Sequence, residues 1–285
     1  MIRSLPNRRR YLYSYKLYMG LYFTFLFAPL VVTCVLAFND SQFPALPWKG
    51  FTLEWFTGDL SHRVGILNDR MNLESIWVSA QVAFFVMLLS VTVGTCAAFL
   101  FEQEEFPFKP VLYFLMLSPL VIPGVILGIS ILLFSNTLGM FFETTWGIDV
   151  PLFRPGFWLV VLGQFSFITT LVTLVVSARL RKFDRTLEEA ALNLGANRFE
   201  VIWHITLKYL RQAMVGAAAV AFLMSFENFN TTLFLTGSEA TLPINLYLQV
   251  RDGSTPVVNA ITFLLIVGTS LAAVINLYFS RKQDR

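Results

Sequence analysis

The chain has 285 residues, of which 56% are hydrophobic and only 14% charged, and its mean hydropathy is +0.64. This composition excludes an ordinary soluble domain and indicates an integral membrane protein. The formal net charge of +3 comes from short runs of Lys and Arg between apolar segments, which argues against the basic surface of a nucleic-acid-binding protein.

Six segments are long and apolar enough to cross a bilayer, which takes about 20 residues in a helix. In chain order they are Leu17–Phe38, Trp77–Phe101, Val111–Phe134, Phe157–Ala178, Ala213–Thr236 and Val257–Phe279. The sequence therefore predicts an all-α membrane protein, with six transmembrane helices in a single transmembrane domain over residues 1–285. The first segment is longer than the apolar part of a signal peptide, so we expect it to be retained.

Basic residues are distributed unequally between the two sides of these spans. Of the 21 Lys and Arg residues, 16 lie before the first span, between the second and third, between the fourth and fifth, or after the sixth. By the positive-inside rule we expect the N-terminal segment 1–16, the C-terminus and residues 179–211 to be cytoplasmic. The first outer connection contains Trp48 and Trp55, for which interfacial anchoring and partner binding both remain open.

The third segment is interrupted by Pro119, Pro123, Gly124 and Gly128. Broken helices line cavities and provide hinges in transporters, although Pro and Gly are also common in ordinary membrane helices. The sequence predicts a kink here and leaves its role in gating open.

A polar stretch, residues 186–207, lies between the fourth and fifth segments. Thr186 and Glu189 have the spacing of a capping box, in which the hydroxyl and the carboxylate each accept a hydrogen bond from a backbone N–H at the start of a helix. Gly195 is suited to end that helix after about two turns. An apolar stripe with helical spacing runs along it and consists of Leu187, Ala190, Ala191 and Leu194.

A second short helix is predicted directly after the first. Asn197 is suited to its N-cap, and one face of it then carries Phe199, Ile202, Trp203 and Thr206. Helices this short are marginal in water, so the pair needs a surface to pack on. Periodicity alone leaves two surfaces equally open: this protein's own helix ends or the membrane interface, and a groove of a separate soluble protein.

The fifth segment contains one ionisable residue well inside its apolar run, Glu227. A carboxylate in the bilayer core is costly, so it marks a transport pathway or has a partner. In a continuous helix Glu227, Asn230 and Thr231 share a polar stripe. An aromatic stripe beside it consists of Phe222, Phe226 and Phe229.

Acid and aromatic groups together favour a passing organic cation, because a carboxylate neutralises an ammonium group and ring faces attract cations. The alternative is an interhelical hydrogen bond from a protonated Glu227, with the Phe rings as ordinary packing.

No catalytic or metal-binding constellation is present in the sequence. His62 and His204 fall on opposite predicted sides of the membrane, and Cys34 and Cys96 fall inside apolar segments. The chain also lacks a phosphate-binding G-x-x-x-x-G-K-[ST] loop. We therefore expect no enzyme activity, no cofactor and no bound metal, with energy supplied by other proteins.

The polar stretch resembles a known family motif. Glu189-Ala190-Ala191, three residues, Gly195, nine residues and then Ile205-x-Leu207 are similar to the EAA loop of membrane permeases from bacterial ABC importers of the type I, binding-protein-dependent class. The family pattern ends in Leu-Pro, whereas Leu207 is followed here by Lys208.

Further stretches extend the resemblance over nearly the whole chain. Residues 28–43, 48–56, 118–134, 177–196 and 242–261 are similar to the permease subunits of spermidine/putrescine importers. The resemblance implies the type I importer permease fold in the inner (plasma) membrane of a bacterium. It also implies that residues 179–211 form a coupling segment docking into a cytoplasmic ATPase. The residues expected to carry this contact are Thr186, Leu187, Glu188, Glu189, Ala190, Ala191, Leu194, Gly195 and Phe199.

The resemblance further implies a set of partners: a second, homologous permease, two ATPase subunits that bind ATP, an extracytoplasmic solute-binding protein and the lipid bilayer. The expected function is half of an alternating-access pathway for a polyamine, with Glu227, Asn230, Thr231 and Phe226 along it. Two alternatives stay open. One is the same importer class carrying another amine or small organic solute, and the other is a channel or structural membrane scaffold without ATPase coupling.

Overall fold

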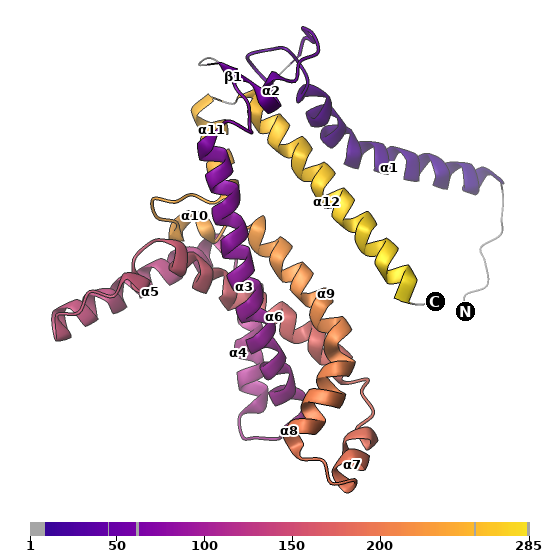
Figure 1. Cartoon of the computed structure of the whole chain (residues 1–285), viewed down its shortest axis with the longest axis vertical. Coiled ribbons are helices and arrows are strands. Elements are labelled where there is room, and N and C mark those ends of the chain that lie inside the picture. Colours follow the sequence, from indigo (N-terminus) through magenta and orange to yellow (C-terminus); the bar gives the residue numbers. More distant parts are fainter. Residues whose placement is uncertain (1–8, 45, 61–62, 254, 284–285) are drawn as a thin grey trace. The chain divides into compact units, whose positions relative to one another are not determined.

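The computed structural model describes residues 9–44, 46–60, 63–253 and 255–283, and these are mostly helical (Figure 1). The predicted all-α class is confirmed. Two compact units are present: Glu74–Asn245 forms one, and the described parts of Met1–Leu73 and Leu246–Arg285 form the other. His62 and residues 1–8 of the predicted cytoplasmic N-terminus lie outside the described residues.

The elements follow in chain order. The first group is α1 (Arg9–Leu36), α2 (Glu54–Thr57), the antiparallel pair β1 (Asp59–Leu60) and β2 (Arg63–Val64), α3 (Arg70–Gln103), α4 (Lys109–Val121), α5 (Gly124–Trp146) and a 3-10 turn, Pro151–Phe153. The second group is α6 (Phe157–Leu180), α7 (Thr186–Asn193), α8 (Arg198–Val201), a π-helical turn (Ile202–Thr206), α9 (Leu207–Phe226), α10 (Thr232–Leu235), α11 (Leu242–Gly253) and α12 (Pro256–Gln283).

In the unit that contains both terminal helices, the connection after α1 is built around Trp55. Its side chain is buried, and its Nε1 donates a 2.8 Å hydrogen bond to the Asn39 carbonyl. The Arg63 guanidinium lies 5.5 Å from the ring and donates to both Glu54 (2.7 Å) and Asp40 (2.6 Å). These hydrogen bonds raise the pKa of Arg63, and the bond to Glu54 has the largest effect. Trp55 is therefore a core residue of this connection.

Most of the predicted spans are found as long apolar helices. α1, α3, α5, α6 and the continuous stretch Arg198–Phe226 are long and apolar enough to cross a membrane. Two more apolar helices in the described chain are shorter, Lys109–Val121 and the part Pro256–Leu271 of α12. The count of six transmembrane helices stays a prediction.

The third predicted span is not one kinked helix but two helices. α4 ends at Val121, and α5 begins at Gly124. Proline lacks a backbone N–H and disfavours helical conformation in the residue before it. Ile122, which precedes Pro123, accordingly has an extended conformation with φ −74° and ψ 129°. Pro119, by contrast, lies inside α4 without ending it.

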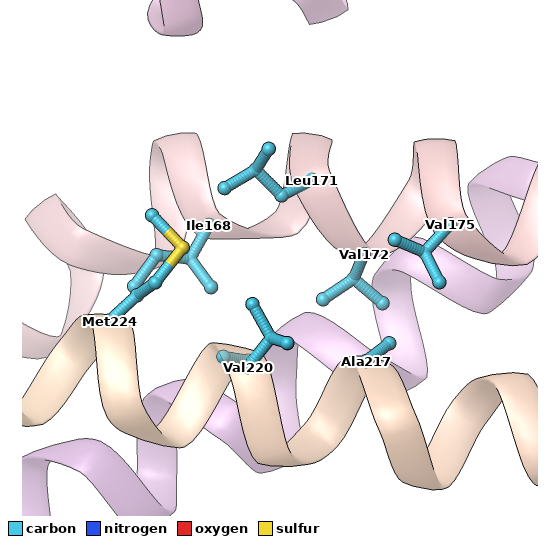
Figure 2. Close-up of a pocket in the computed structure, with 8 residues that line it drawn as sticks. Ile168, Leu171, Val172, Val175, Ala217, Val220 and Met224 are labelled. Atoms are coloured by element: carbon cyan, nitrogen blue, oxygen red, sulfur yellow. The ribbon is translucent and has the colours of Figure 1, made fainter. Parts of the chain in front are cut away.

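α6 is the centre of the 74–245 unit. In the most apolar 18-residue stretch of α6, 56% of the residues are buried, whereas in that of α5 only 11% are. The rest of the protein therefore covers α6 but leaves most of α5 exposed. Figure 2 shows Ile168, Val172 and Val175 of α6 facing the small and apolar side chains of α9 across a narrow apolar gap. α3 also packs against α6, because Gly94 of α3 has no side chain and lets the Val172 side chain of α6 approach closely. This packing positions α9, at whose end lie two of the predicted pathway residues, Phe226 and the C-cap Glu227.

Candidate functional site

The first part of the site is the segment between α6 and α9. The glycine stop predicted for its first helix is confirmed, since α7 ends at Asn193 and Gly195 has a φ of +93°. The Gly195 N–H donates to Leu192 O (3.0 Å) and the Ala196 N–H to Ala191 O (3.1 Å). This pair of bonds is the Schellman motif, and it satisfies carbonyls at the helix end.

The start of α7 differs from the prediction. Thr186 and Glu189 do not form a capping box; the Thr186 hydroxyl instead donates to Asp184 Oδ1 at 2.8 Å, and the Thr186 N–H donates to the same oxygen at 3.0 Å. Both bonds lower the pKa of the exposed Asp184 carboxyl, and the bond from the Thr186 hydroxyl has the larger effect. Asp184, two residues before Thr186, therefore starts the helix, because the short Asp side chain can accept a hydrogen bond from a nearby backbone N–H that has no partner within the helix.

The second predicted cap is confirmed, but the helix that it starts is much longer than expected. The Glu200 N–H donates to Asn197 Oδ1 and the Asn197 N–H to Glu200 Oε2, both at 2.9 Å. From Arg198 the helix continues through the π-helical turn into α9 and ends at Phe226. The coupling segment is therefore joined to the fifth predicted span without a loop, and Lys208 lies within this helix.

Polar contacts hold the coupling segment against the end of α3. Arg181 forms a bidentate pair with Glu102, with Nε–Oε2 and Nη2–Oε1 both 2.8 Å, and Arg185 Nη2 donates to the Glu102 carbonyl at 2.7 Å. The pairing raises the pKa of Arg181. On the other side of the segment, the Thr206 hydroxyl donates to Glu188 Oε1. α7 is thus tied at its base to α3 and along its length to the π-helical turn.

The outer surface of the coupling segment is apolar and uncovered. Leu194 is 89% exposed, Phe199 72% and Leu187 52%. Ala190 and Glu189 are also exposed, whereas Ala191 is half-buried. The Phe199 ring stacks on Trp203 with centroids 6.1 Å apart. Large apolar side chains in this arrangement are typical of a surface that a partner covers.

The second part of the site is the end of α9. A continuous helix through Thr236 was expected, and this is wrong: α9 ends at Phe226, Glu227 is its C-cap, and α10 starts at Thr232. The shared polar stripe of Glu227, Asn230 and Thr231 is therefore wrong as well. Glu227 and Asn230 are exposed, but Thr231 is buried. Asn228 causes the break locally, since its Oδ1 accepts bonds from the Thr232 N–H (3.3 Å) and hydroxyl (3.0 Å).

A buried glutamine of α6 holds both sides of the break. Gln164 Nε2 donates to the Thr232 hydroxyl at 2.8 Å, and the Ser225 hydroxyl donates to Gln164 Oε1. All three residues are buried. Gln164 thus bonds the last turn of α9 and the first turn of α10 at the same time. It was missed from sequence, although an amide side chain in an apolar span is a signal for such a role.

The break after α9 lies against the break between α4 and α5. A Cβ on Gly128 would lie 2.8 Å from the Thr231 carbonyl oxygen, and one on Gly124 would lie 3.1 Å from the Asn230 Cβ. Glycine at these two positions allows the backbones to approach closely. The interrupted third and fifth predicted spans therefore meet at their interruptions, as discontinuous helices do at transporter binding sites.

The chemistry at the break favours a cation. The Glu227 carboxylate forms no ion pair within the described chain, and it stands at the C-terminal end of a 20-residue helix. Helix C-termini carry partial negative charge from unpaired carbonyls, which adds to that of the carboxylate. Beside it, Phe226 stacks on Phe222 with centroids 6.1 Å apart. An ammonium group would find a negative charge and ring faces here.

Comparisons with known proteins agree with this architecture. The family model of the "binding-protein-dependent transport system inner membrane component" matches residues 90–285. The chain is 30% identical over 265 residues to the putrescine transport system permease protein PotI of Escherichia coli (strain K12), covering 92% of this chain and 89% of that protein. It is 27% identical over 251 residues to the spermidine/putrescine transport system permease protein PotC of the same strain, covering 88% and 87%.

A solved structure has a similar fold. It is the crystal structure of a bacterial ABC transporter involved in the import of the acidic polysaccharide alginate, with a TM-score of 0.68 over 99% of each chain. At 12% sequence identity the likeness concerns the fold alone. The predicted permease fold is thereby confirmed.

The close approach at Gly128 predicts a destabilising effect of Gly128→Ala. The added methyl group meets backbone rather than a flexible side chain, so we expect a cost of about 1–3 kcal/mol and a Tm lower by about 2–8 °C in the solubilised protein. Gly216→Ala in α9 is the control, because nothing lies within 4 Å of the added Cβ. There, removing a helix-interior glycine should raise the Tm slightly. Equal shifts for both variants would contradict the contact.

The bonds of Gln164 predict that Gln164→Leu loosens the α9–α10 break. Each interhelical bond lost should cost about 0.6–1.7 kcal/mol, and hydrogen exchange of the Thr232 and Leu233 amides should speed up. Gln81→Leu in α3 is a matched control, since Gln81 is half-buried and no side-chain hydrogen bond is found for it. Exchange mass spectrometry that shows unchanged protection in Gln164→Leu would rule out this role.

Proposed function

The chain belongs to the family of binding-protein-dependent transport system inner membrane components, and we propose that it forms half of the translocation pathway of an ATP-driven importer for a polyamine such as putrescine or spermidine. It is a permease subunit of an ABC importer and not an enzyme, so separate subunits hydrolyse the ATP. The proposed complex contains a second, homologous permease, two ATPase subunits and an extracytoplasmic solute-binding protein.

The observation that carries the proposal is the exposed, braced coupling segment. Leu194 and Phe199 present apolar surface, while Arg181 and Arg185 bond the end of α3 and Glu188 bonds the π-helical turn, so the segment is held in place with that surface uncovered. A docking site must be rigid to transmit force, and this one continues directly into α9. Movement of a docked ATPase would therefore be transmitted to the break at Glu227. A channel or scaffold has no need of such a surface.

The cargo proposal rests on charge and on the names of relatives. Two relatives are named as putrescine and spermidine/putrescine permeases. In this chain Glu227 and the α9 C-terminus provide negative charge without an ion-pair partner among the described residues, and Phe226 adds a ring face. We assign Glu227, Phe226 and Asn230 to the pathway wall. Thr231, which is buried, would act by fixing the break beneath them.

The proposed mechanism is alternating access. With the coupling segment and the termini on the cytoplasmic side, as the distribution of basic residues favours, Glu227 lies sixteen residues beyond Arg211, about 24 Å along the helix. With Arg211 in the headgroup region of a bilayer about 40–45 Å thick in all, that distance supports a position of the carboxylate near the middle. The helix interruptions at 122–123 and 227–231 meet there and provide hinges at which the path opens to one side and then the other.

Coupling is tested with Glu189→Ala and Leu194→Ala. Each removes an exposed part of the docking surface, so ATP-dependent uptake should fall about tenfold or more, equivalent to ~1.4 kcal/mol of coupling, while membrane insertion stays normal. Asn193→Ala, on the exposed end of the same helix, is the control. ATPase subunits should co-purify less with the Leu194 variant. Normal uptake in both variants would contradict docking through α7.

Cargo is tested by uptake of labelled spermidine and putrescine into cells that express the complete transporter. Glu227→Gln keeps the shape but removes the charge, so saturable polyamine uptake should fall about tenfold. Glu239→Gln changes an exposed acid in the connection after α10 and should have no effect. Uptake that persists in Glu227→Gln would assign the residue to structure. Without polyamine uptake in an assembled complex, another amine or small organic solute would be the cargo.

A further inference from the structure

A wide groove lies along the first half of α9, and apart from Trp203, which stacks on Phe199, its lining residues have no role in the transport proposal. Its volume is about 720 Å³, within the roughly 300–1,000 Å³ typical of small-molecule sites. One lining residue, Val91, comes from α3, and the others follow the π-helical turn and α9. We call it the α3/α9 groove; its lining is Val91, Trp203, His204, Leu207, Lys208, Arg211, Met214, Val215 and Ala218.

The groove changes character along its length. Trp203, His204, Lys208 and Arg211 line the end nearer to α8, whereas beyond Arg211 the lining is entirely apolar. From Lys208 to Ala218 the helix rises about 15 Å. A charged end followed by some 15 Å of apolar surface matches the division of a phospholipid into headgroup and acyl chain.

The positive charge in the groove is not neutralised within the described chain. Lys208 and Arg211 are exposed and form no ion pair there, and none of the lining residues is acidic. The nearby acids already have partners, since Glu188 accepts from Thr206 and Glu200 from the Asn197 N–H. Two unpaired cations three residues apart on one helix face make a site for an anion.

We propose that the α3/α9 groove binds one anionic phospholipid, with the phosphate between Lys208 and Arg211 and an acyl chain along Met214 and Val215. Basic pockets beside membrane helices favour anionic headgroups, and Trp203, a residue type enriched at membrane interfaces, lines the same end of the groove as Lys208 and Arg211. Lys208 occupies the position at which the family pattern has proline. One of the two cations in the groove is therefore a feature of this chain and not of the family pattern. The lipid would contact the same helix that joins the coupling segment to Glu227.

The test measures lipid retention by the purified, complete transporter. After detergent exchange, native mass spectrometry should find phosphatidylglycerol retained at least about tenfold over phosphatidylcholine. Lys208→Gln with Arg211→Gln should abolish that preference. Lys182→Gln with Arg198→Gln removes the same charge from exposed positions outside the groove, and should keep it. Equal retention of the two lipids, or a preference that survives in the Lys208 and Arg211 variant, would overturn the proposal.

A second measurement distinguishes lipid from protein in the groove. Val215→Cys is made in a chain with Cys34 and Cys96 replaced by Ala, because Val215 is 63% exposed on the apolar part of the groove. A lipid-soluble maleimide should label it in the assembled transporter, and added phosphatidylglycerol should slow the labelling. Cross-linking of this cysteine to the second permease or to α12, with no lipid effect, would show that a helix covers the groove and would refute lipid binding.

Discussion

The Gln164 amide holds together the two ends of an interrupted membrane helix, and the geometry of the proposed pathway depends on it. Inside a bilayer no water is available to pair backbone groups that leave a helix, so an interruption must be satisfied by protein. Here the Asn228 N–H donates to Ser225 O, the Leu233 N–H to Phe229 O and the Thr232 N–H to Asn228 Oδ1. Gln164 bonds the hydroxyls of Ser225 and Thr232, and the glycines of α5 allow its backbone to approach Thr231. With these groups satisfied, Glu227 can remain exposed at the end of α9.

The long helix Arg198–Phe226 links the two parts of the site. Its 29 residues extend about 43 Å, from the proposed docking surface at Phe199 to the carboxylate at Glu227. At one end the Asn197–Glu200 capping box starts the helix, and the Glu188–Thr206 contact fixes it to α7. At the other, Gln164 fixes it to α6. A rigid connection of this kind suits a permease, because force from ATP-driven subunits has to reach the pathway without being lost in a flexible loop.

The π-helical turn Ile202–Thr206 is the one irregular part of that connection. π-helical turns are rare and are often found at functional sites. In this one, Trp203 and His204 line the α3/α9 groove, Trp203 also stacks on Phe199, and Thr206 is buried and bonded to Glu188. A lipid headgroup at Lys208 and Arg211 would thus lie within two turns of the contact that orients α7. Membrane composition and ATPase docking would act on the same short stretch of helix.

The sequence by itself determined the features that depend on local pattern. Apolar runs predicted α1, α3 and α6, Gly195 predicted the end of α7, and Asn197 with Glu200 predicted the start of α8, because caps and helical stripes involve neighbours within four residues. Tertiary structure decided the rest. Glu102 bonds arginines 79 and 83 residues away, and Gln164 bonds residues 61 and 68 away, so no local pattern could place them. The end of α9 at Phe226 also depends on tertiary structure, since Gln164 of α6 bonds the hydroxyls of Ser225 and Thr232 on the two sides of the break, and α5 approaches Asn230 and Thr231 closely.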